Sequence, residues 1–302
     1  MTENQRDTTT STSSRSFIEP RQRTGHATPQ WLIASDLDGT LLDHYSYSHA
    51  PADPMLRQLE KDNIPLILNS SKTRNEILTL RAALCNRHPF IVENGSAIFI
   101  PAGYFPERPG IAAEMGDFWV IEPGAPRQRI LAFLDQDKTS HGAPYLNFAS
   151  ASNTEIVEAT GLTPTEAEQA NQRDYSEPLL WQGDEQQKQA FITRANAAGF
   201  TTLQGGRFLH LLGQTDKGQA TTLLKKTYQK FSDGPCTLIA SGDGPNDLDM
   251  LKAADIAVLV RSPAHGLPQF THPKRLIVTR EFGPLGWAEA MTEILNEPEA
   301  LN

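Results

Sequence analysis

The stretch Trp31-Leu32-Ile33-Ala34-Ser35, followed directly by Asp36-Leu37-Asp38-Gly39-Thr40, decides the fold class of this 302-residue chain. The run from Trp31 to Ser35 is almost continuously apolar, which is typical of a strand buried on both faces of a parallel sheet. Asp36 stands where that strand ends. In open α/β sheets the ligand site lies outside the carboxyl ends of the strands, so we expect Asp36 and Asp38 to face a binding crevice.

Further apolar runs repeat this arrangement along the chain. Ile64 to Leu68 ends in a polar loop, after which Thr73 and Glu76 form the capping box of a helix. A third apolar run, Phe90 to Val92, is followed by Asn94-Gly95, which predicts a hairpin turn. Late in the chain, strands are expected at residues 237–240, 256–260 and 276–278. Strands that alternate with helices predict an α/β fold with a doubly wound, mostly parallel sheet, a Rossmann-like core.

The middle of the chain has a different pattern. Phe118 to Ile121, 201–203 and 208–212 are expected as strands, and helices are expected to begin at Thr163 and to span 184–198. We therefore expect an inserted α+β cap domain. The predicted division is a disordered tail at 1–30, a core at 31–102 and 211–296, and the insert at 103–210.

Composition excludes several classes of function. Lys and Arg number 27 against 36 for Asp and Glu, and this net charge of -9 provides no basic footprint for nucleic acid or an anionic membrane. The longest apolar runs are far shorter than the roughly 20 residues of a membrane helix. The N-terminus lacks a secretory signal, and two cysteines are too few for a disulfide framework, so we expect a cytoplasmic protein with a small-molecule partner.

A second acidic cluster follows the strand expected at 237–240. The loop Ser241-Gly242-Asp243-Gly244-Pro245-Asn246-Asp247 should meet Asp36 at the same sheet edge. Hard carboxylate oxygens in such a group suit Mg²⁺, which keeps water and substrate phosphate as its other ligands. Asp36 can act as a nucleophile that forms an aspartyl-phosphate, while Asp38 protonates the leaving oxygen and then activates water.

Phosphate also needs hydrogen-bond donors and a cation. Ser70, at the end of the second strand, offers its hydroxyl next to a helix N-terminus, and Lys217 can supply a point charge. Each of these segments alone has a simpler interpretation. Asp243 to Asp247 has the composition of a solvated turn, and an isolated lysine usually lies on the surface.

Together these segments resemble, in order, the four motifs of the haloacid dehalogenase superfamily. The resemblance implies a nucleophile at Asp36, an acid/base at Asp38, and phosphate contacts from Ser70 and Lys217. It implies Mg²⁺ on Asp36, on the backbone carbonyl of Asp38 and on Asp243, with Asp247 supporting the metal or Lys217. The insert resembles the cap of the subgroup that hydrolyses phosphorylated sugars and related small metabolites.

Four segments resemble, more closely, the mannosyl-3-phosphoglycerate phosphatase family: Leu68 to Thr73, Val92 to Gly95, Arg173 to Pro178 and Gly205 to Phe208. Asn69 departs from the Thr expected there. The resemblance implies removal of phosphate from a glycosyl-3-phosphoglycerate to give a glycosylglycerate of the compatible-solute type. The expected substrate-binding residues are Ser71, Asn94, Arg173, Ser176, Glu177, Gly206, Arg207 and Asn246.

Within the cap, Arg173 and Arg207 can pair with the glycerate carboxylate, because a guanidinium matches a carboxylate bidentately. Ser176 and Glu177 can bind sugar hydroxyls. Alternatively, Arg173 and Glu177 form a weak ion pair on the cap surface.

Other functions remain open at this stage. They are phosphatase action on glucosyl-3-phosphoglycerate or another sugar phosphate, phosphoryl transfer to a second hydroxyl, and non-catalytic metabolite binding. Dehalogenation needs no acid/base at the second position, so Asp38 favours phosphoryl transfer.

Overall fold

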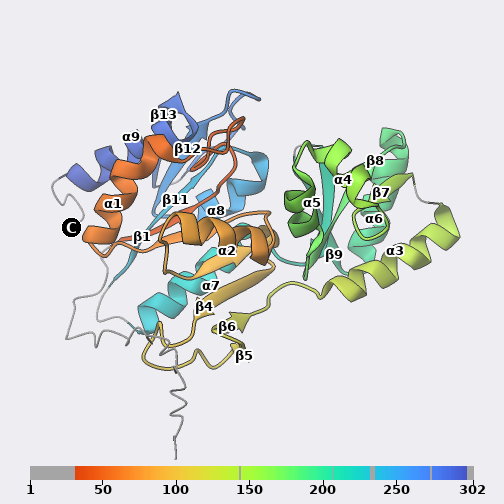
Figure 1. Ribbon diagram of the computed structural model, residues 1–302, viewed down its shortest axis with the longest axis horizontal. Helices are drawn as coiled ribbons and strands as arrows, with labels where there is room; N and C mark the ends of the chain where they lie inside the picture. Colours follow the sequence, from red (N-terminus) through yellow and green to blue (C-terminus); the bar gives the residue numbers. More distant parts are fainter. Residues whose placement is uncertain (1–30, 143, 206, 232–234, 273, 298–302) are drawn as a thin grey trace, which may run out of the picture.

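The computed structural model describes residues 31–297 except 143, 206, 232–234 and 273. The tail expected at 1–30 and the substrate-binding residue expected at Gly206 lie outside the described residues. The chain forms two bodies, each built on its own sheet, which lie side by side in Figure 1. Within these residues no helix is both long and apolar enough to cross a bilayer.

The larger body contains a nine-stranded sheet in the order β13-β12-β11-β1-β2-β3-β4-β6-β5. Its centre is parallel: β1 (Trp31–Ser35) lies between β11 (Thr237–Gly242) and β2 (Leu66–Asn69). On one side follow β12 (Ile256–Arg261) and β13 (Arg275–Phe282), also parallel. This confirms the doubly wound, mostly parallel α/β core.

Helices cover both faces of this sheet. Three of them, α1 (Asp53–Lys61), α2 (Arg74–Ala83) and α9 (Gly283–Asn296), contribute to the apolar cluster that contains Ile33. On the opposite face, α7 (Lys217–Lys230) and α8 (Leu248–Ala253) pack on the cluster that contains Leu32 and Ala34. Neighbouring residues of β1 thus point to opposite cores, which explains its continuous apolar sequence.

The strand register brings three loops to the same level. Ser35 pairs with Ser241 on one side and with Leu68 on the other. The residues that follow these positions therefore leave the sheet together at its carboxyl edge. This edge carries Asp36, Ser70 and Asp243.

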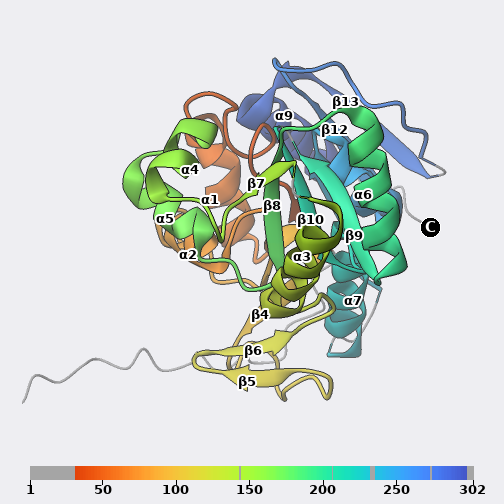
Figure 2. The same ribbon diagram turned by 90° about the vertical axis from the view of Figure 1, so that its right-hand side faces the viewer.

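The smaller body is an antiparallel sheet in the order β7-β8-β10-β9. Its strands are β7 (Tyr145–Asn147), β8 (Ser176–Trp181), β9 (Phe200–Gly205) and β10 (Phe208–Gly213). Two helices, α3 (Arg127–His141) and α6 (Glu185–Ala197), share one apolar cluster with this sheet. A second, smaller cluster contains side chains of α4 (Asn153–Thr160) and α5 (Pro164–Asn171). Figure 2 shows these two helix pairs apart from each other.

The expected start of the insert at residue 103 differs from the observed strand pairing. The strands β5 (Ala113–Met115) and β6 (Phe118–Ile121) extend the larger sheet, because β6 pairs antiparallel with β4 (Ala97–Pro101). The ring of Phe118 packs edge-on against Phe90 and Phe99 of the larger core. At the other end, β10 continues three residues beyond the expected limit of 210. The antiparallel body therefore lies between Ile121 and about Gly213.

Local signals in the sequence were accurate. Thr73 forms the expected capping box, and Thr163 begins the helix expected there, also with a capping box. The Asn94-Gly95 turn joins β3 (Phe90–Val92) to β4 as an antiparallel pair, through a 3-10 turn at Glu93–Gly95. Further short 3-10 turns occur at Ala50–Ala52 and Pro245–Asp247.

Candidate active site

A cavity of about 370 Å³ lies at the carboxyl edge of the larger sheet and is also lined by residues of the smaller body. The larger body contributes the carboxylates of the β1 and β11 loops together with the loop that follows β2. The smaller body contributes residues of β9, β10 and the segment before β8. The lining includes Asp36, Asp38, Ser71, Asn94, Arg173 and Asn246.

Lys217 lies between two of the buried carboxylates. Its Nζ is 2.5 Å from Oδ1 of Asp36 and 2.7 Å from Oδ1 of Asp247, and the lysine is fully buried. Lys217 is the first residue of α7, and Asp216 caps that helix by accepting a hydrogen bond from the N–H of Gln219. The lysine predicted as a phosphate-binding cation is therefore an internal group of the carboxylate cluster.

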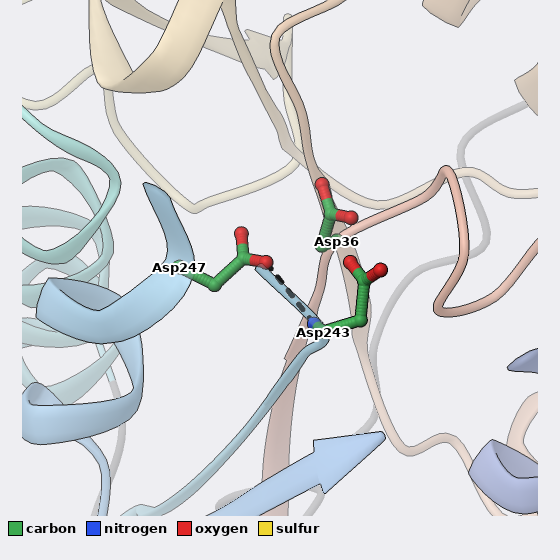
Figure 3. A group of neighbouring side chains, drawn as sticks. All are labelled: Asp36, Asp243 and Asp247. Atoms are coloured by element: carbon green, nitrogen blue, oxygen red, sulfur yellow. Dashed lines mark hydrogen bonds between the residues drawn. The ribbon is translucent and has the colours of Figure 1, made fainter. Parts of the chain in front are cut away.

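Asp36, Asp243 and Asp247 form this cluster, and each offers an oxygen within 4.8 Å of the others. Figure 3 shows the carboxylates of Asp36 and Asp243 next to each other, with Asp247 opposite them. Burial and the nearby charge of Asp247 raise the pKa of Asp36 to about 7. Burial and the charge of Asp36 likewise raise the pKa of Asp243 to about 7. Ionisation of Asp36 and Asp243 next to Asp247 is therefore unfavourable, and a bound cation would neutralise this negative charge.

Asp247 has both oxygens occupied. Oδ1 accepts from Lys217, while Oδ2 accepts from the backbone N–H groups of Asp243 and Gly244 at 3.1 and 3.0 Å. Asp247 therefore holds the loop after β11 in shape and fixes Lys217. Of the two roles that the resemblance implied, these contacts fit support of Lys217.

Asp38 lines the cavity and is partly exposed. Its Oδ2 lies 2.9 Å from Nζ of Lys72, and its Oδ1 is buried without a hydrogen-bond partner among the described residues. Gly39 makes this geometry possible: its φ is +83°, and a Cβ there would lie 2.5 Å from Oδ2 of Asp243. A larger residue would be strained and would displace that carboxylate.

Ser70 and Asn94 belong to adjoining loops. The backbone N–H of Asn94 donates to the carbonyl of Ser70, and Oγ of Ser70 accepts from the N–H of Lys72 at 3.2 Å. Oδ1 of Asn94 is buried without a partner among the described residues, and Asn94 lines the cavity.

Asn69, where the sequence departs from the expected Thr, donates to the carbonyl of Lys217 and to Oγ1 of Thr221. It thus ties β2 to α7.

Arg173 lines the cavity but is held by neighbours. Its Nη2 donates to the carbonyl of Ser71 at 2.6 Å and its Nε to Oγ of Ser176 at 3.0 Å, while Glu93 lies 3.4 Å away. Arg173 therefore connects the smaller body to the loop after β2. The alternative of a surface pair with Glu177 was wrong, because Arg173 is buried against Glu93.

Glu177 and Ser176 are fully buried and are not among the residues that line the cavity. Glu177 accepts from Nε of Arg127 at 2.6 Å and from the N–H of Ala149 at 2.7 Å. The structure does not bring Glu177 and Ser176 to the cavity with the other expected substrate-binding residues.

Arg207 and Asn246 do line the cavity. Arg207 is exposed, and its Nη2 donates to the carbonyl of Thr160 at 2.9 Å. Ser71 also lines the cavity, at the base of the loop that Arg173 contacts.

Sequence reasoning missed several lining residues. His265 lies 3.2 Å from Oδ2 of Asp243, and Phe148 and Phe208 form an edge-to-face pair in the wall. His210 also lines the cavity. Burial and the charges of Arg173 and Lys217 lower its pKa to about 3, so it is neutral. Lys72, which lies within the segment from Leu68 to Thr73, lines the cavity as well. Because these side chains come from distant segments, only the fold places them together.

The donor set fits a divalent cation. Three buried carboxylates face a single buried ammonium within the described cluster, and all the donors are hard oxygens. Asp36 and Asp243 are the two members with oxygens directed at each other in Figure 3.

Comparison with known proteins identifies the family of this chain. A family described as haloacid dehalogenase-like hydrolase matches residues 33–106. A protein of Methanococcoides burtonii named glucosyl-3-phosphoglycerate/mannosyl-3-phosphoglycerate phosphatase is 36% identical over 267 residues, covering 88% of this chain and 97% of its own. A protein of the same name from Persephonella marina is 35% identical over 273 residues, 89% of this chain and 98% of its own.

Solved structures share the fold. A haloacid dehalogenase-like hydrolase from B. subtilis aligns with a TM-score of 0.58 at 17% identity, covering 87% of this chain and 99% of its own. The sucrose-phosphatase from Synechocystis aligns with a TM-score of 0.57 at 14% identity, covering 87% and 97%. With relatives above 30% identity over nearly the whole of both chains, this chain is a phosphatase that belongs to the haloacid dehalogenase-like hydrolases, in the family of the glucosyl-3-phosphoglycerate/mannosyl-3-phosphoglycerate phosphatases.

Proposed function

We propose that this phosphatase removes the phosphate of glucosyl- or mannosyl-3-phosphoglycerate in a Mg²⁺-dependent reaction, leaving a glycosylglycerate of the compatible-solute type. The contact between Asp36 and Lys217 at 2.5 Å supports the chemistry most directly. This contact orients the buried carboxylate of Asp36 at the end of β1, the position from which it would attack phosphorus. The names of the two relatives support the substrate class.

The residues of the chain divide the reaction into two steps. Asp36 attacks phosphorus and forms an aspartyl-phosphate, and Asp38 gives a proton to the leaving oxygen of the glycerate. Asp38 then takes a proton from the water that hydrolyses the aspartyl-phosphate. Its Oδ1, buried without a partner among the described residues, is suited to this exchange.

Lys217 and the loops around it position the phosphate. The lysine orients Asp36 and offsets part of the charge that develops on the phosphoryl oxygens. Asn94 lines the cavity and offers its side-chain N–H groups to those oxygens, while Ser70, whose carbonyl accepts from the backbone N–H of Asn94, offers its hydroxyl from the adjoining loop. Asp247 holds Lys217 in place, because it pairs with the same ammonium at 2.7 Å.

Asp36, Asp243 and the backbone carbonyl of Asp38 are the proposed Mg²⁺ ligands. When bound, the ion neutralises the repulsion between these carboxylates and an anionic phosphate. The raised pKa values of Asp36 and Asp243 support this assignment, since both groups resist ionisation while no cation compensates them.

A substrate panel tests the proposal. Phosphate release should be measured from glucosyl-3-phosphoglycerate, mannosyl-3-phosphoglycerate, 3-phosphoglycerate and hexose phosphates, with Mg²⁺ and with a chelator. We expect the two glycosyl esters to have the highest kcat/KM and the chelator to abolish release. Asp36→Asn should lower kcat by about 10³-fold or more, because the nucleophilic charge is lost. A higher kcat/KM on a hexose phosphate, or full activity of Asp36→Asn, would refute the assignment.

A further inference from the structure

Lys72 is the cation closest to the leaving-group side of the site. Its Nζ lies 2.9 Å from Oδ2 of Asp38, the proposed proton donor to the leaving oxygen. Its side chain is 18% exposed and lines the cavity, and its ammonium lies 5.3 Å from the ring centre of Tyr47. Lys72 is therefore fixed from two sides while it remains open to a ligand.

The two arginines among the described lining residues, Arg173 and Arg207, have different partners. All three side-chain nitrogens of Arg173 donate to protein groups, Nε to Ser176, Nη1 to the carbonyl of Ala170 and Nη2 to that of Ser71. Arg207 is exposed and tied to a carbonyl of α4. A lysine ammonium has three N–H bonds, so Lys72 can hold Asp38 and a second anion together.

The chemistry of the proposed substrate places a second anion there. In a glycosyl-3-phosphoglycerate, the phosphate ester is on carbon 3, the carboxylate is carbon 1, and the sugar occupies the remaining hydroxyl on carbon 2. Only carbons 2 and 3 separate the carboxylate from the leaving oxygen. When Asp38 contacts that oxygen, the carboxylate necessarily lies within a few ångströms of Asp38, where Lys72 is the neighbouring cation.

We propose that Lys72 binds the glycerate carboxylate and so selects α-oxy carboxylate phosphates over sugar phosphates that carry no carboxylate, an assignment that rests on the proposed function. Burial would lower the pKa of Lys72, but the charges of Asp38 and Glu76 more than reverse this, so the ammonium stays charged. Arg173, which the sequence suggested for this task, instead positions the loop that carries Lys72 through its bond to Ser71.

The test compares two substrates that differ only in charge: a glycosyl-3-phosphoglycerate and the same ester with its carboxylate converted to the primary amide. For the wild type we expect kcat/KM to be about 10- to 100-fold higher on the acid, the range of a charged hydrogen bond. In Lys72→Met this acid-to-amide ratio should fall towards one. Lys72→Arg should keep most of it, since the charge is retained.

Two matched variants serve as controls. Lys252→Met removes an exposed lysine that pairs with Asp249 and is not among the residues that line the cavity, so this variant should keep the wild-type ratio. Arg207→Met tests the competing cation and should also keep the ratio. Circular dichroism confirms folding, and Lys72→Gln replaces Lys72→Met if that variant does not fold.

The outcomes separate the two proposals. Three results would overturn the role of Lys72 and leave the proposed function standing. The first is an acid-to-amide ratio near one in the wild type, and the second is an unchanged ratio in Lys72→Met even where both activities fall. The third is a ratio that falls to one in Arg207→Met but not in Lys72→Met. A wild type that releases phosphate from neither glucosyl- nor mannosyl-3-phosphoglycerate, while it hydrolyses another monoester, would overturn both.

Discussion

Glu93 accepts a hydrogen bond from the hydroxyl of Ser176 at 2.6 Å, which joins the loop after β3 to the first residue of β8. Glu93 is 1% exposed and also accepts from the backbone N–H groups of Asp174 and Tyr175 at 2.8 and 3.2 Å. One carboxylate of the core thus holds three consecutive residues of the cap. Since Arg173 precedes these residues and lines the cavity, Glu93 sets the position of the cavity wall.

Glu93→Gln should weaken this connection without removing a group that touches substrate. The neutral amide keeps the size but exchanges one acceptor for a donor and loses the ion pair with Arg173. We expect kcat/KM on a glycosyl-3-phosphoglycerate to fall about 10-fold, the effect of losing roughly 1.4 kcal/mol of positioning. Hydrolysis of p-nitrophenyl phosphate, which needs less of the cap, should change less. Equal losses on both substrates would contradict a role in cap positioning, and Glu107→Gln, which alters an exposed ion pair, is the control.

Glu177→Gln distinguishes a structural from a substrate-binding role. Glu177 is fully buried and bonded to Arg127, so neutralising it leaves a largely buried guanidinium without its counter-ion. We expect a loss of about 2 kcal/mol or more in the free energy of unfolding. Thermal and urea unfolding measure this. If stability is unchanged and KM for the glycosyl ester rises instead, Glu177 contacts the sugar as the sequence suggested.

Gly39→Ala should damage the metal site through Asp243. The added Cβ would lie 2.5 Å from Oδ2 of Asp243, and the residue would have to adopt a φ of +83°. We expect the apparent Mg²⁺ affinity in the phosphatase assay to fall about 10-fold or more, because the carboxylate must move, in addition to about 1 kcal/mol of backbone strain. Gly103→Ala is the matched control, because Gly103 has a φ of +78° and open space around its Cβ position. Similar Mg²⁺ affinities for the two variants would contradict this explanation.

Mg²⁺ should stabilise the protein more at pH 8 than at pH 5. Burial raises the pKa of Asp36 and Asp243 to about 7, above the ordinary value of 3.8. A carboxyl whose pKa is higher in the folded state gives a stability that is present at low pH and is lost as pH rises through the folded pKa. The metal-free protein should therefore lose Tm between about pH 4 and 7, and Mg²⁺ should restore it at pH 8.

The measurement is Tm against pH with and without Mg²⁺. Asp243→Asn should reduce both the pH-dependent loss and the Mg²⁺ effect, since one of the two ionising groups is removed. An Mg²⁺ effect on Tm that is as large at pH 5 as at pH 8 would show that these carboxylates are not the groups involved.

The sequence indicated the core of the site because its signals are local. Asp36 and Asp38 directly follow the apolar strand β1, and the parallel register that brings Asp243 beside Asp36 follows from the strand order of an α/β sheet. The helix that begins after Thr73 was equally visible, since a capping box lies within four residues.

The limits of the cap were less predictable. Phe118 to Ile121 has the pattern of a strand, but a strand pattern does not say which sheet it joins. Its pairing with β4 depends on the apolar contact of Phe118 with the larger core. The short strand β7 and the helix α3 carried no strong local signal and appear only in the structure.

The sequence by itself determined where the acidic residues lie: Asp36 at a strand end with Asp38 two residues later, and a second acidic loop at the same sheet edge. Local order along the chain suffices for these, because the ends of parallel strands converge. Only the tertiary structure decided the partners of the charged side chains: Glu177 pairs with Arg127, Arg173 with Glu93, and Lys72 with Asp38. Such pairs form between segments far apart in the chain, and their choice depends on which charges the packed fold buries together.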